Sequence, residues 1–285
     1  MILFKRSLEL INHLQAKVNA KLKIGFAPTM GALHQGHISL ITESKKNCDI
    51  TVCSIFVNPT QFNDPKDFQK YPITLEKDIY LLEKNGTDIL FLPQAQEIYP
   101  SGTKDLEHYD LGYLESILEG KYRQGHFQGV CQVMSRLLTI VQPDFLFMGQ
   151  KDYQQCMVVK RLLQIMKLNA KFITCATLRE SDGLAMSSRN LRLNEKQRIN
   201  ATGIYQALTY IKENIESENF NNILADARSI LESKDFKIDY VEIADANDLQ
   251  LLKNWDGKQK IVALIAAFQD EIRLIDNMIL NSEHN

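Results

Sequence analysis

Two histidines three residues apart carry the first sign of chemistry in this chain. They are His34 and His37, within the segment Pro-Thr-Met-Gly-Ala-Leu-His-Gln-Gly-His at residues 28–37. This spacing places both imidazoles on one face of the first turn of a helix. Such a turn also offers backbone N–H groups and the positive end of the helix dipole, which favour a phosphate group. An ordinary turn with surface histidines explains this segment alone equally well. The interpretation as a metal site has less support, because no third ligand is apparent.

A second segment complements the first. Residues 182–190 form a glycine-containing loop in which the adjacent hydroxyls of Ser187 and Ser188 precede the guanidinium of Arg189. Hydroxyls and a bidentate guanidinium suit phosphate oxygens. A Ser-Ser-Arg sequence is more often a plain loop. Taken together, however, the two segments predict a nucleoside-triphosphate site, one for the α-phosphate and nucleoside and the other for the outer phosphates.

Further polar residues follow predicted strands. Gly149 permits a turn, Lys151 can pair with a phosphate, and Asp152 can cap a helix or bind a ribose hydroxyl, although a solvated Lys–Asp pair is the simpler alternative. Asn58 and Gln61 place neutral amides at the end of another strand. Neutral amides can hold a carboxylate without the tight charge pairing that would lower its nucleophilicity. A turn at Asn58-Pro59 would also explain the first of them. Residues 123–127 are a further polar cluster before a helix.

Alternating strand and helix patterns occupy residues 1–178. They predict βαβ units and a parallel sheet, hence an α/β fold with a Rossmann-like first domain. After Arg189, helical patterns precede closely spaced strands, which predict a smaller α+β domain with an antiparallel sheet over residues 179–285. The predicted strands cover residues 23–27, 50–57, 88–92, 144–148, 170–176, 239–244, 261–268 and 272–275. The predicted helices cover residues 38–46, 74–85, 153–166, 194–215 and 222–233.

Composition narrows the class of protein. The formal net charge of -2 gives no electrostatic reason to expect nucleic acid as a partner. The five cysteines are scattered without a Cys-x-x-Cys pair, which is typical of buried thiols in a reducing compartment. No apolar run approaches the length of a membrane span, and charge at Lys5 and Arg6 comes too early for a signal peptide. We therefore expect a cytoplasmic protein that does not bind membranes.

The chain resembles the pantoate–β-alanine ligase family, within the cytidylyltransferase-like nucleotidyltransferase superfamily. The matching stretches are residues 28–37, 54–62, 151–155 and 182–190, with further agreement at 239–243 and 273–277. The resemblance implies a Rossmann-like domain, a smaller C-terminal lid domain and a homodimer. It also implies two half-reactions: the carboxylate of pantoate attacks the α-phosphorus of MgATP to give pantoyl adenylate and pyrophosphate, and β-alanine then displaces AMP.

The same resemblance assigns roles to individual positions. Pantoate would be held by Gln61 and Gln155, with Asn58 as a helper. His34, His37, Lys151 and Ser188, with Mg²⁺, would stabilise charge during the reaction, with His37 the best candidate for proton donation or for stabilising the leaving group. No metal ligand is assigned, and Gln150 stands where the family often has glutamate. The ATP-binding residues would be Met30, His34, His37, Gly149, Gln150, Lys151, Asp152, Leu178, Met186, Ser187, Ser188 and Arg189.

Three other functions share parts of this pattern. A related nucleotidyltransferase acting on a phosphorylated acceptor would need a basic acceptor pocket, whereas the predicted one contains Asn58, Gln61 and Gln155. A fragment of an aminoacyl-tRNA synthetase is disfavoured by the near-neutral charge. A nucleotide-binding regulator without catalysis would have little use for His34, His37, Lys151 and Ser188 together. Turnover with ATP, pantoate and β-alanine separates these cases.

Overall fold

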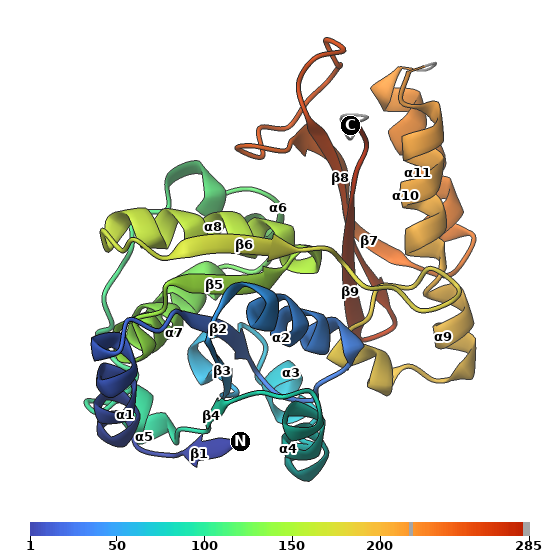
Figure 1. Cartoon of the computed structure of the whole chain (residues 1–285). Helices are drawn as coiled ribbons and strands as arrows, with labels where there is room; N and C mark the ends of the chain where they lie inside the picture. Colours follow the sequence, from blue (N-terminus) through green and yellow to red (C-terminus); the bar gives the residue numbers. More distant parts are fainter. Residues whose placement is uncertain (217–218, 282–285) are drawn as a thin grey trace. The chain divides into compact units, whose positions relative to one another are not determined.

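The computed structural model describes residues 1–216 and 219–281 of the chain, and Figure 1 shows it as a ribbon. The chain divides into two compact units, one comprising Met1–Gln150 with Gln154–Ala176, the other Lys151–Tyr153 with Thr177–Asn285. Residues 217, 218 and 282–285 of the predicted C-terminal domain lie outside the described residues. Within residues 1–216 and 219–281, none of the helices has the length and apolar character needed to cross a membrane.

The first unit contains a six-stranded sheet in the order β1-β4-β3-β2-β5-β6. All of its strand pairs are parallel. The strands are β1 (Ile2–Phe4), β2 (Ile24–Thr29), β3 (Ile50–Ile55), β4 (Ile89–Phe91), β5 (Phe145–Gly149) and β6 (Lys171–Cys175). The helices are α1 (Ser7–Asn19), α2 (Gln35–Asn47), α3 (Pro65–Gln69), α4 (Leu75–Lys84), α5 (Ala95–Ile98), α6 (Leu118–Tyr122), α7 (His126–Val141) and α8 (Tyr153–Ile165).

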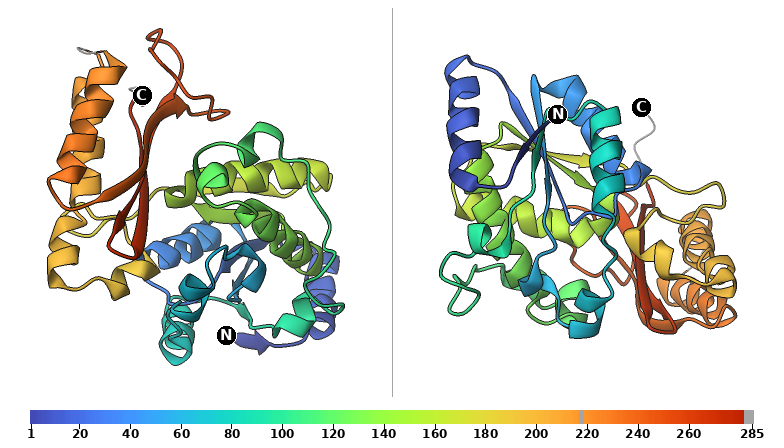
Figure 2. Two further views of the ribbon diagram at one scale, coloured as in Figure 1. Left: turned by 180° about the vertical axis from the view of Figure 1, so that it is seen from behind. Right: turned by 90° about the horizontal axis from the view of Figure 1, so that it is seen from below.

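Helices cover both faces of this sheet, and the alternation of side chains along the strands explains why. Phe26 and Leu146 belong to a core with α1, α7 and α8, whereas the next residues, Ala27 and Phe147, belong to a core with α2 and α4. Successive side chains of a strand point to opposite faces, so each strand must be apolar on both. Figure 2 shows the resulting three layers of helix, sheet and helix.

The strand order fixes where a ligand can bind. From β2 the chain proceeds to β3 and β4 on one side of the sheet, and it returns to β5 and β6 on the other side. The direction of the strand order therefore changes between the adjacent strands β2 and β5, which is a topological switch point. Ligands of open α/β sheets bind at such a point, beyond the carboxyl ends of the strands. The segment with His34 and His37 follows β2, and Gly149 ends β5.

The second unit is built on the antiparallel sheet β7-β8-β9. Its strands are β7 (Lys237–Asp245), β8 (Ile261–Gln269) and β9 (Ile272–Ile279). Its helices are α9 (Glu195–Asn200), α10 (Gly203–Asn214) and α11 (Phe220–Glu232). The apolar sides of α10 and α11 pack on the sheet and share one core with it, including Leu208, Ile223 and Ile265.

The predicted α/β class is confirmed, with a parallel sheet and a separate small antiparallel sheet. The single helix predicted over residues 194–215 is wrong: α9 and α10 are separate, with Ala201 and Thr202 between them. Thr202 and Gly203 are weak helix formers at this break. Gly203 also lies so close to Lys234 that a Cβ would come within 2.5 Å of its side chain. The sequence analysis did not predict β1 or α1.

Candidate active site

His34 and His37 form the N-terminal cap of α2. Nδ1 of His34 accepts a hydrogen bond from the backbone N–H of Gly36 at 3.2 Å, and Nδ1 of His37 accepts one from the backbone N–H of His34 at 3.3 Å. The two ring centroids are 4.1 Å apart. An Nδ1 that accepts carries no proton, so each neutral imidazole carries its proton on Nε2. The turn therefore holds two imidazole N–H donors at the amino end of a helix, where a phosphate is favoured.

A buried carboxylate that the sequence analysis did not single out holds the turn before α2. Asp78, on α4, is only 1% exposed. It accepts hydrogen bonds at 2.8 Å from the backbone N–H groups of Ala32 and Leu33, and one from the Thr74 hydroxyl at 2.9 Å. Ala32 has a φ of +49°, which costs strain in a non-glycine residue, so the chain needs such an anchor here. The only sequence signal was an acidic residue in the first turn of a predicted helix.

Replacing Asp78 by asparagine is expected to lower the free energy of unfolding by about 2–3 kcal/mol, because an amide nitrogen then faces a buried donor and leaves it unsatisfied. We also expect the KM for the predicted nucleoside triphosphate to rise, since the turn that carries His34 loosens. Denaturant unfolding and steady-state kinetics measure both effects. Glu76→Gln, an exposed change in the first turn of the same helix, is the control and should alter neither quantity. A stable Asp78→Asn protein would show that the carboxylate does not anchor the turn.

The ends of β2 and β3 bring three predicted residues together. The Nδ2 of Asn58 donates to the Oε1 of Gln61 at 3.0 Å, and the Nε2 of Gln61 lies 3.0 Å from the sulfur of Met30. Asn58 and Gln61 are both buried. Asn58 also caps the 3₁₀ turn Pro59–Gln61 that carries Gln61, so the predicted turn at Asn58-Pro59 and a role beside Gln61 are compatible.

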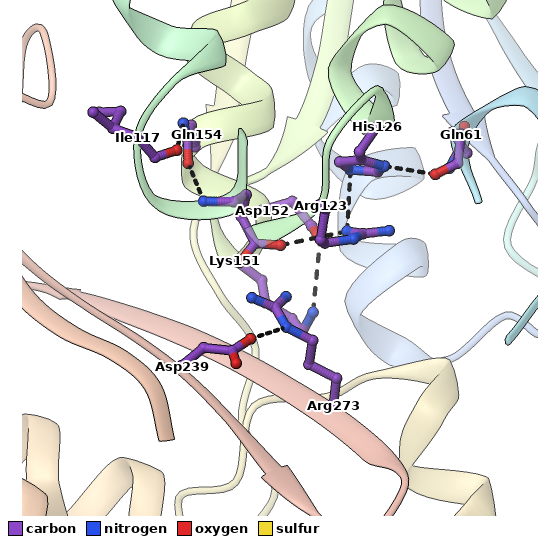
Figure 3. A network of polar contacts seen from close by, with 10 residues as sticks. Gln61, Ile117, Arg123, His126, Lys151, Asp152, Gln154, Asp239 and Arg273 are labelled. Atoms are coloured by element: carbon purple, nitrogen blue, oxygen red, sulfur yellow. Dashed lines mark hydrogen bonds and ion pairs between the residues drawn. The ribbon is translucent and has the colours of Figure 1, made fainter. Parts of the chain in front are cut away.

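The polar cluster at residues 123–127 holds Gln61 through a hydrogen bond to its main-chain carbonyl. Figure 3 shows His126 between Arg123 and Gln61. The Arg123 guanidinium can only donate, so the Nε2 of His126 accepts from it at 3.1 Å. The protonated Nδ1 of His126 then donates to the carbonyl of Gln61 at 2.8 Å. Arg123 in turn pairs with the carboxylate of Glu119 at 3.4 Å.

The adjacent residues Gln154 and Gln155 have different surroundings. Gln154 is 2% exposed, accepts from the N–H of Glu119 at 2.9 Å and donates to the carbonyls of Leu114 and Ile117. Gln155 is half-buried. The hydrogen bonds of Gln154 fix the loop before α6, so Gln155 remains the better candidate for a substrate contact.

In the second unit, Lys151 and Asp152 are held through the main chain. The Nδ2 of Asn277, a buried residue of β9, donates to the carbonyl of Lys151 at 2.9 Å. The ammonium of Lys151 is 3.8 Å from the carboxylate of Asp152, and the Lys151 side chain is 16% exposed. The main chain at the predicted phosphate-binding residue Lys151 is therefore anchored to the sheet of the second unit.

The loop at residues 178–190 is a small hairpin with its own anchors. The N–H of Met186 donates to the carbonyl of Leu178 at 3.0 Å, which brings these two predicted residues together. The hydroxyl of Ser187 accepts from the N–H of Arg189 at 3.3 Å and caps the 3₁₀ turn Ser188–Arg192. Ser188 is buried.

Arg179 fixes this hairpin to β9, a contact that sequence reasoning missed. Its guanidinium donates to both carboxylate oxygens of Asp276 and, at 3.1 Å, to the carbonyl of Gly183. Burial raises the pKa of Asp276, and the Arg179 guanidinium opposes that rise. Gly183 has a φ of +91°, and a Cβ there would lie 2.0 Å from the Tyr205 ring, so the hairpin requires glycine. The residues Asp276 and Asn277 belong to the stretch 273–277 noted above.

The predicted site residues are thus divided between the two units. The first unit holds Met30, His34, His37, Asn58, Gln61, Gly149, Gln150 and Gln155. The second holds Lys151, Asp152, Leu178, Met186, Ser187, Ser188 and Arg189. Over residues 1–216 and 219–281, no group of three or more His, Cys, Asp or Glu side chains is arranged to hold a metal ion.

This sheet and the turn at its switch point define a class of protein, the α/β enzymes of Rossmann-like type that use a nucleotide. The profile of the family described as Pantoate-beta-alanine ligase matches residues 3–279. Pantothenate synthetase of Cytophaga hutchinsonii is 41% identical over 94% of this chain and 95% of its own. That of Flavobacterium psychrophilum is 41% identical over 98% of this chain and 100% of its own.

Solved structures agree with the sequence relatives. Pantothenate synthetase from Thermus thermophilus has a TM-score of 0.89 and 35% identity, over 99% of this chain and 100% of that one. Pantoate-beta-alanine ligase from Francisella tularensis, complexed with Beta-gamma ATP and β-alanine, has a TM-score of 0.83 and 38% identity, over 99% of this chain and 98% of that one. The chain belongs to the pantoate-beta-alanine ligase family, and it is an ATP-dependent ligase that condenses pantoate with β-alanine. The predicted family and reaction are confirmed.

Proposed function

We propose that this condensation proceeds through a pantoyl-adenylate intermediate, with the residues assigned above in their predicted roles. The carboxylate of pantoate attacks the α-phosphorus of ATP, and the bond to the outer phosphates breaks to release pyrophosphate. The amine of β-alanine then attacks the acyl carbon, and AMP leaves as the amide forms. The observation that carries the proposal is the cap of α2, where His34 and His37 hold Nε2–H donors at the carboxyl end of β2.

The proposed pantoate residues are Gln61 and Gln155, with Asn58 beside Gln61. Pantoate is already ionised at pH 7, so the first step needs no general base. It needs a holder that leaves the carboxylate nucleophilic. Amide groups do this, because they donate hydrogen bonds without neutralising the charge. The hydrogen bond from Asn58 to Gln61 supports this role.

The proposed charge-stabilising residues are His34, His37, Lys151 and Ser188. Negative charge increases on the phosphate oxygens as pyrophosphate departs, and fixed N–H, ammonium and hydroxyl groups lower the barrier where they are positioned beforehand. The half-buried position of the Lys151 side chain strengthens its charge interactions relative to water. The remaining proposed ATP contacts are Met30, Gly149, Gln150, Asp152, Leu178, Met186, Ser187 and Arg189.

Magnesium is proposed to accompany ATP. Mg²⁺ usually keeps several waters and binds through one or two carboxylates together with phosphates, so it needs no cage of protein ligands. Asp78 is an unsuitable ligand because its carboxylate already accepts three hydrogen bonds from the chain. Asp152 is the acidic member of the proposed ATP residues, with its side chain 47% exposed, and would be the ligand. When bound, the ion neutralises part of the phosphate charge.

We further propose that the protein acts in the cytoplasm as a homodimer, with ATP, pantoate and β-alanine as its partners and without nucleic acid or membrane. The family resemblance supports the homodimer, and the net charge of -2 supports the absence of a nucleic-acid partner. Bound β-alanine and Beta-gamma ATP in the Francisella tularensis relative support the small-molecule partners.

Exchange of labelled pyrophosphate into ATP without β-alanine tests the adenylate step. We expect exchange that requires pantoate, because only reversible formation of an adenylate returns label to ATP. Overall turnover with β-alanine but no pantoate-dependent exchange in its absence would contradict a freely formed adenylate. No reaction with any hydroxy acid, despite ATP binding, would favour the regulator without catalysis.

A further inference from the structure

The side-chain amide of Asn58 has only one orientation that its neighbours allow. Its Nδ2 lies 3.0 Å from the main-chain carbonyl of Gly129, which can only accept a hydrogen bond. The nitrogen must therefore face Gly129, and Oδ1 faces the hydroxyl of Tyr99 at 2.7 Å. The backbone N–H and the hydroxyl of Thr60 also donate to this Oδ1, at 3.4 and 3.1 Å. Asn58 is 1% exposed, so water does not compete for these positions.

The orientation of Asn58 decides the orientation of Gln61. The second hydrogen of the Asn58 Nδ2 is donated to the Oε1 of Gln61 at 3.0 Å. With Oε1 accepting, the amide of Gln61 must direct its Nε2 the other way, where it lies 3.0 Å from the sulfur of Met30. One hydrogen of this Nε2 is donated to the sulfur, so Gln61 offers its other N–H to a substrate oxygen. With the amide reversed, it would offer a carbonyl oxygen, which repels a carboxylate.

Tyr99 is placed to maintain this arrangement. It follows α5, is 3% exposed, and its ring lies 5.0 Å from the guanidinium carbon of Arg136. Its hydroxyl is also 3.1 Å from the hydroxyl of Thr60. Burial raises the pKa of Tyr99, so the phenol keeps its proton at neutral pH and can donate it.

We propose that Tyr99 is a positioning residue for pantoate: its hydroxyl holds the amide of Asn58 in the orientation that the Gly129 carbonyl selects, and that amide leaves an N–H of Gln61, not its carbonyl oxygen, for the carboxylate. This inference rests on the proposed role of Gln61 in holding pantoate. Tyr99 itself touches no substrate in this scheme. Its effect should therefore appear in the affinity for pantoate and leave the affinity for ATP unchanged.

Tyr99→Phe tests the inference, since it removes one hydroxyl and keeps the ring. We expect the KM for pantoate to rise about five- to tenfold, the loss expected for one buried hydrogen bond, while the KM for ATP stays within about twofold. Tyr109→Phe is the matched control. Tyr109 is equally buried, but its hydroxyl donates to Glu107 at 3.0 Å, so neither KM should change.

A second variant keeps the inference testable if Tyr99→Phe does not fold. Asn58→Asp has no N–H to donate, so the amide of Gln61 should reverse to donate to the new carboxylate, and the KM for pantoate should rise by more than in Tyr99→Phe. An unchanged KM for pantoate in a folded form of either variant, or an equal rise for pantoate and ATP, would overturn the inference. Absence of pantoate-dependent exchange of pyrophosphate into ATP in the unmodified protein would instead remove the proposed adenylate step.

Discussion

Replacing His37 by alanine is expected to lower pantoate-dependent exchange of pyrophosphate into ATP by about 10²–10³-fold. The reason is the tautomer that the cap of α2 imposes. Because the Nδ1 of His37 accepts from the N–H of His34, the ring presents its proton on Nε2. Removing a fixed donor from a group that gains negative charge raises the barrier of that step. Exchange at saturating ATP and pantoate measures the loss.

A second substitution separates this chemistry from helix capping. His37→Gln keeps an acceptor at the third helical position, where glutamine commonly completes a capping box. We expect the free energy of unfolding of His37→Gln to lie within about 0.5 kcal/mol of that of the unmodified protein. His37→Ala, in contrast, should lower the free energy of unfolding by about 1 kcal/mol. Both should lose exchange to a similar extent. His108→Ala, an exposed histidine far along the chain, serves as the control. Full exchange in a folded His37→Gln protein would show that only capping matters at this position.

The sequence was sufficient to predict five of the six strands of the parallel sheet, β2 to β6, because each of them carries its own signal. The segment Ile50–Ile55 has no charged side chain, which is typical of a strand covered on both faces, and the structure places it inside the parallel sheet. Strand–helix alternation then predicts the Rossmann-like arrangement, and with it the sheet edge where His34 lies. These inferences depend on periodicity and on neighbours in the chain. They require no knowledge of distant contacts.

The residues that hold the site in place could not be predicted in this way. Asp78 accepts from Ala32 across 46 positions, and Tyr99 donates to Asn58 across 41. Arg179 reaches Asp276 across 97 positions. A buried polar residue must find a partner, but periodicity does not say which one. Single residues with chemistry could thus be named from motifs, whereas the hydrogen bonds that orient them required the structure.

The division of the chain into two units also includes a feature that the sequence alone could not predict. Lys151–Tyr153 are grouped with the second unit although Lys151 and Asp152 lie between β5 and α8 in the sequence and Tyr153 begins α8. The hydrogen bond from Asn277 to the carbonyl of Lys151 is one reason, and Tyr153 adds another by donating to the carbonyl of Ala246 at 2.6 Å. A boundary drawn along the sequence cannot assign three residues to a unit whose other members begin at Thr177.

Replacing Lys151 by methionine is expected to lower the kcat of exchange by about 10²-fold or more, because the substitution keeps the stem and removes only the charge. The Lys151 side chain is only 16% exposed, so the attraction of its ammonium for the departing phosphates is weakened less by water than that of a surface lysine. Lys160→Met, on the exposed side of α8, is the matched control and should leave kcat unchanged.

The kinetic parameter that changes decides the role of Lys151. A group that acts on charge developing in the transition state lowers kcat and kcat/KM together, whereas a group that only binds ATP raises KM and leaves kcat intact. The carbonyl of Lys151, held by Asn277, fixes its main chain independently of the side chain, so the substitution should not displace the segment. A raised KM for ATP with full kcat would therefore reassign Lys151 to ground-state binding and leave His34, His37 and Ser188 to stabilise the transition state.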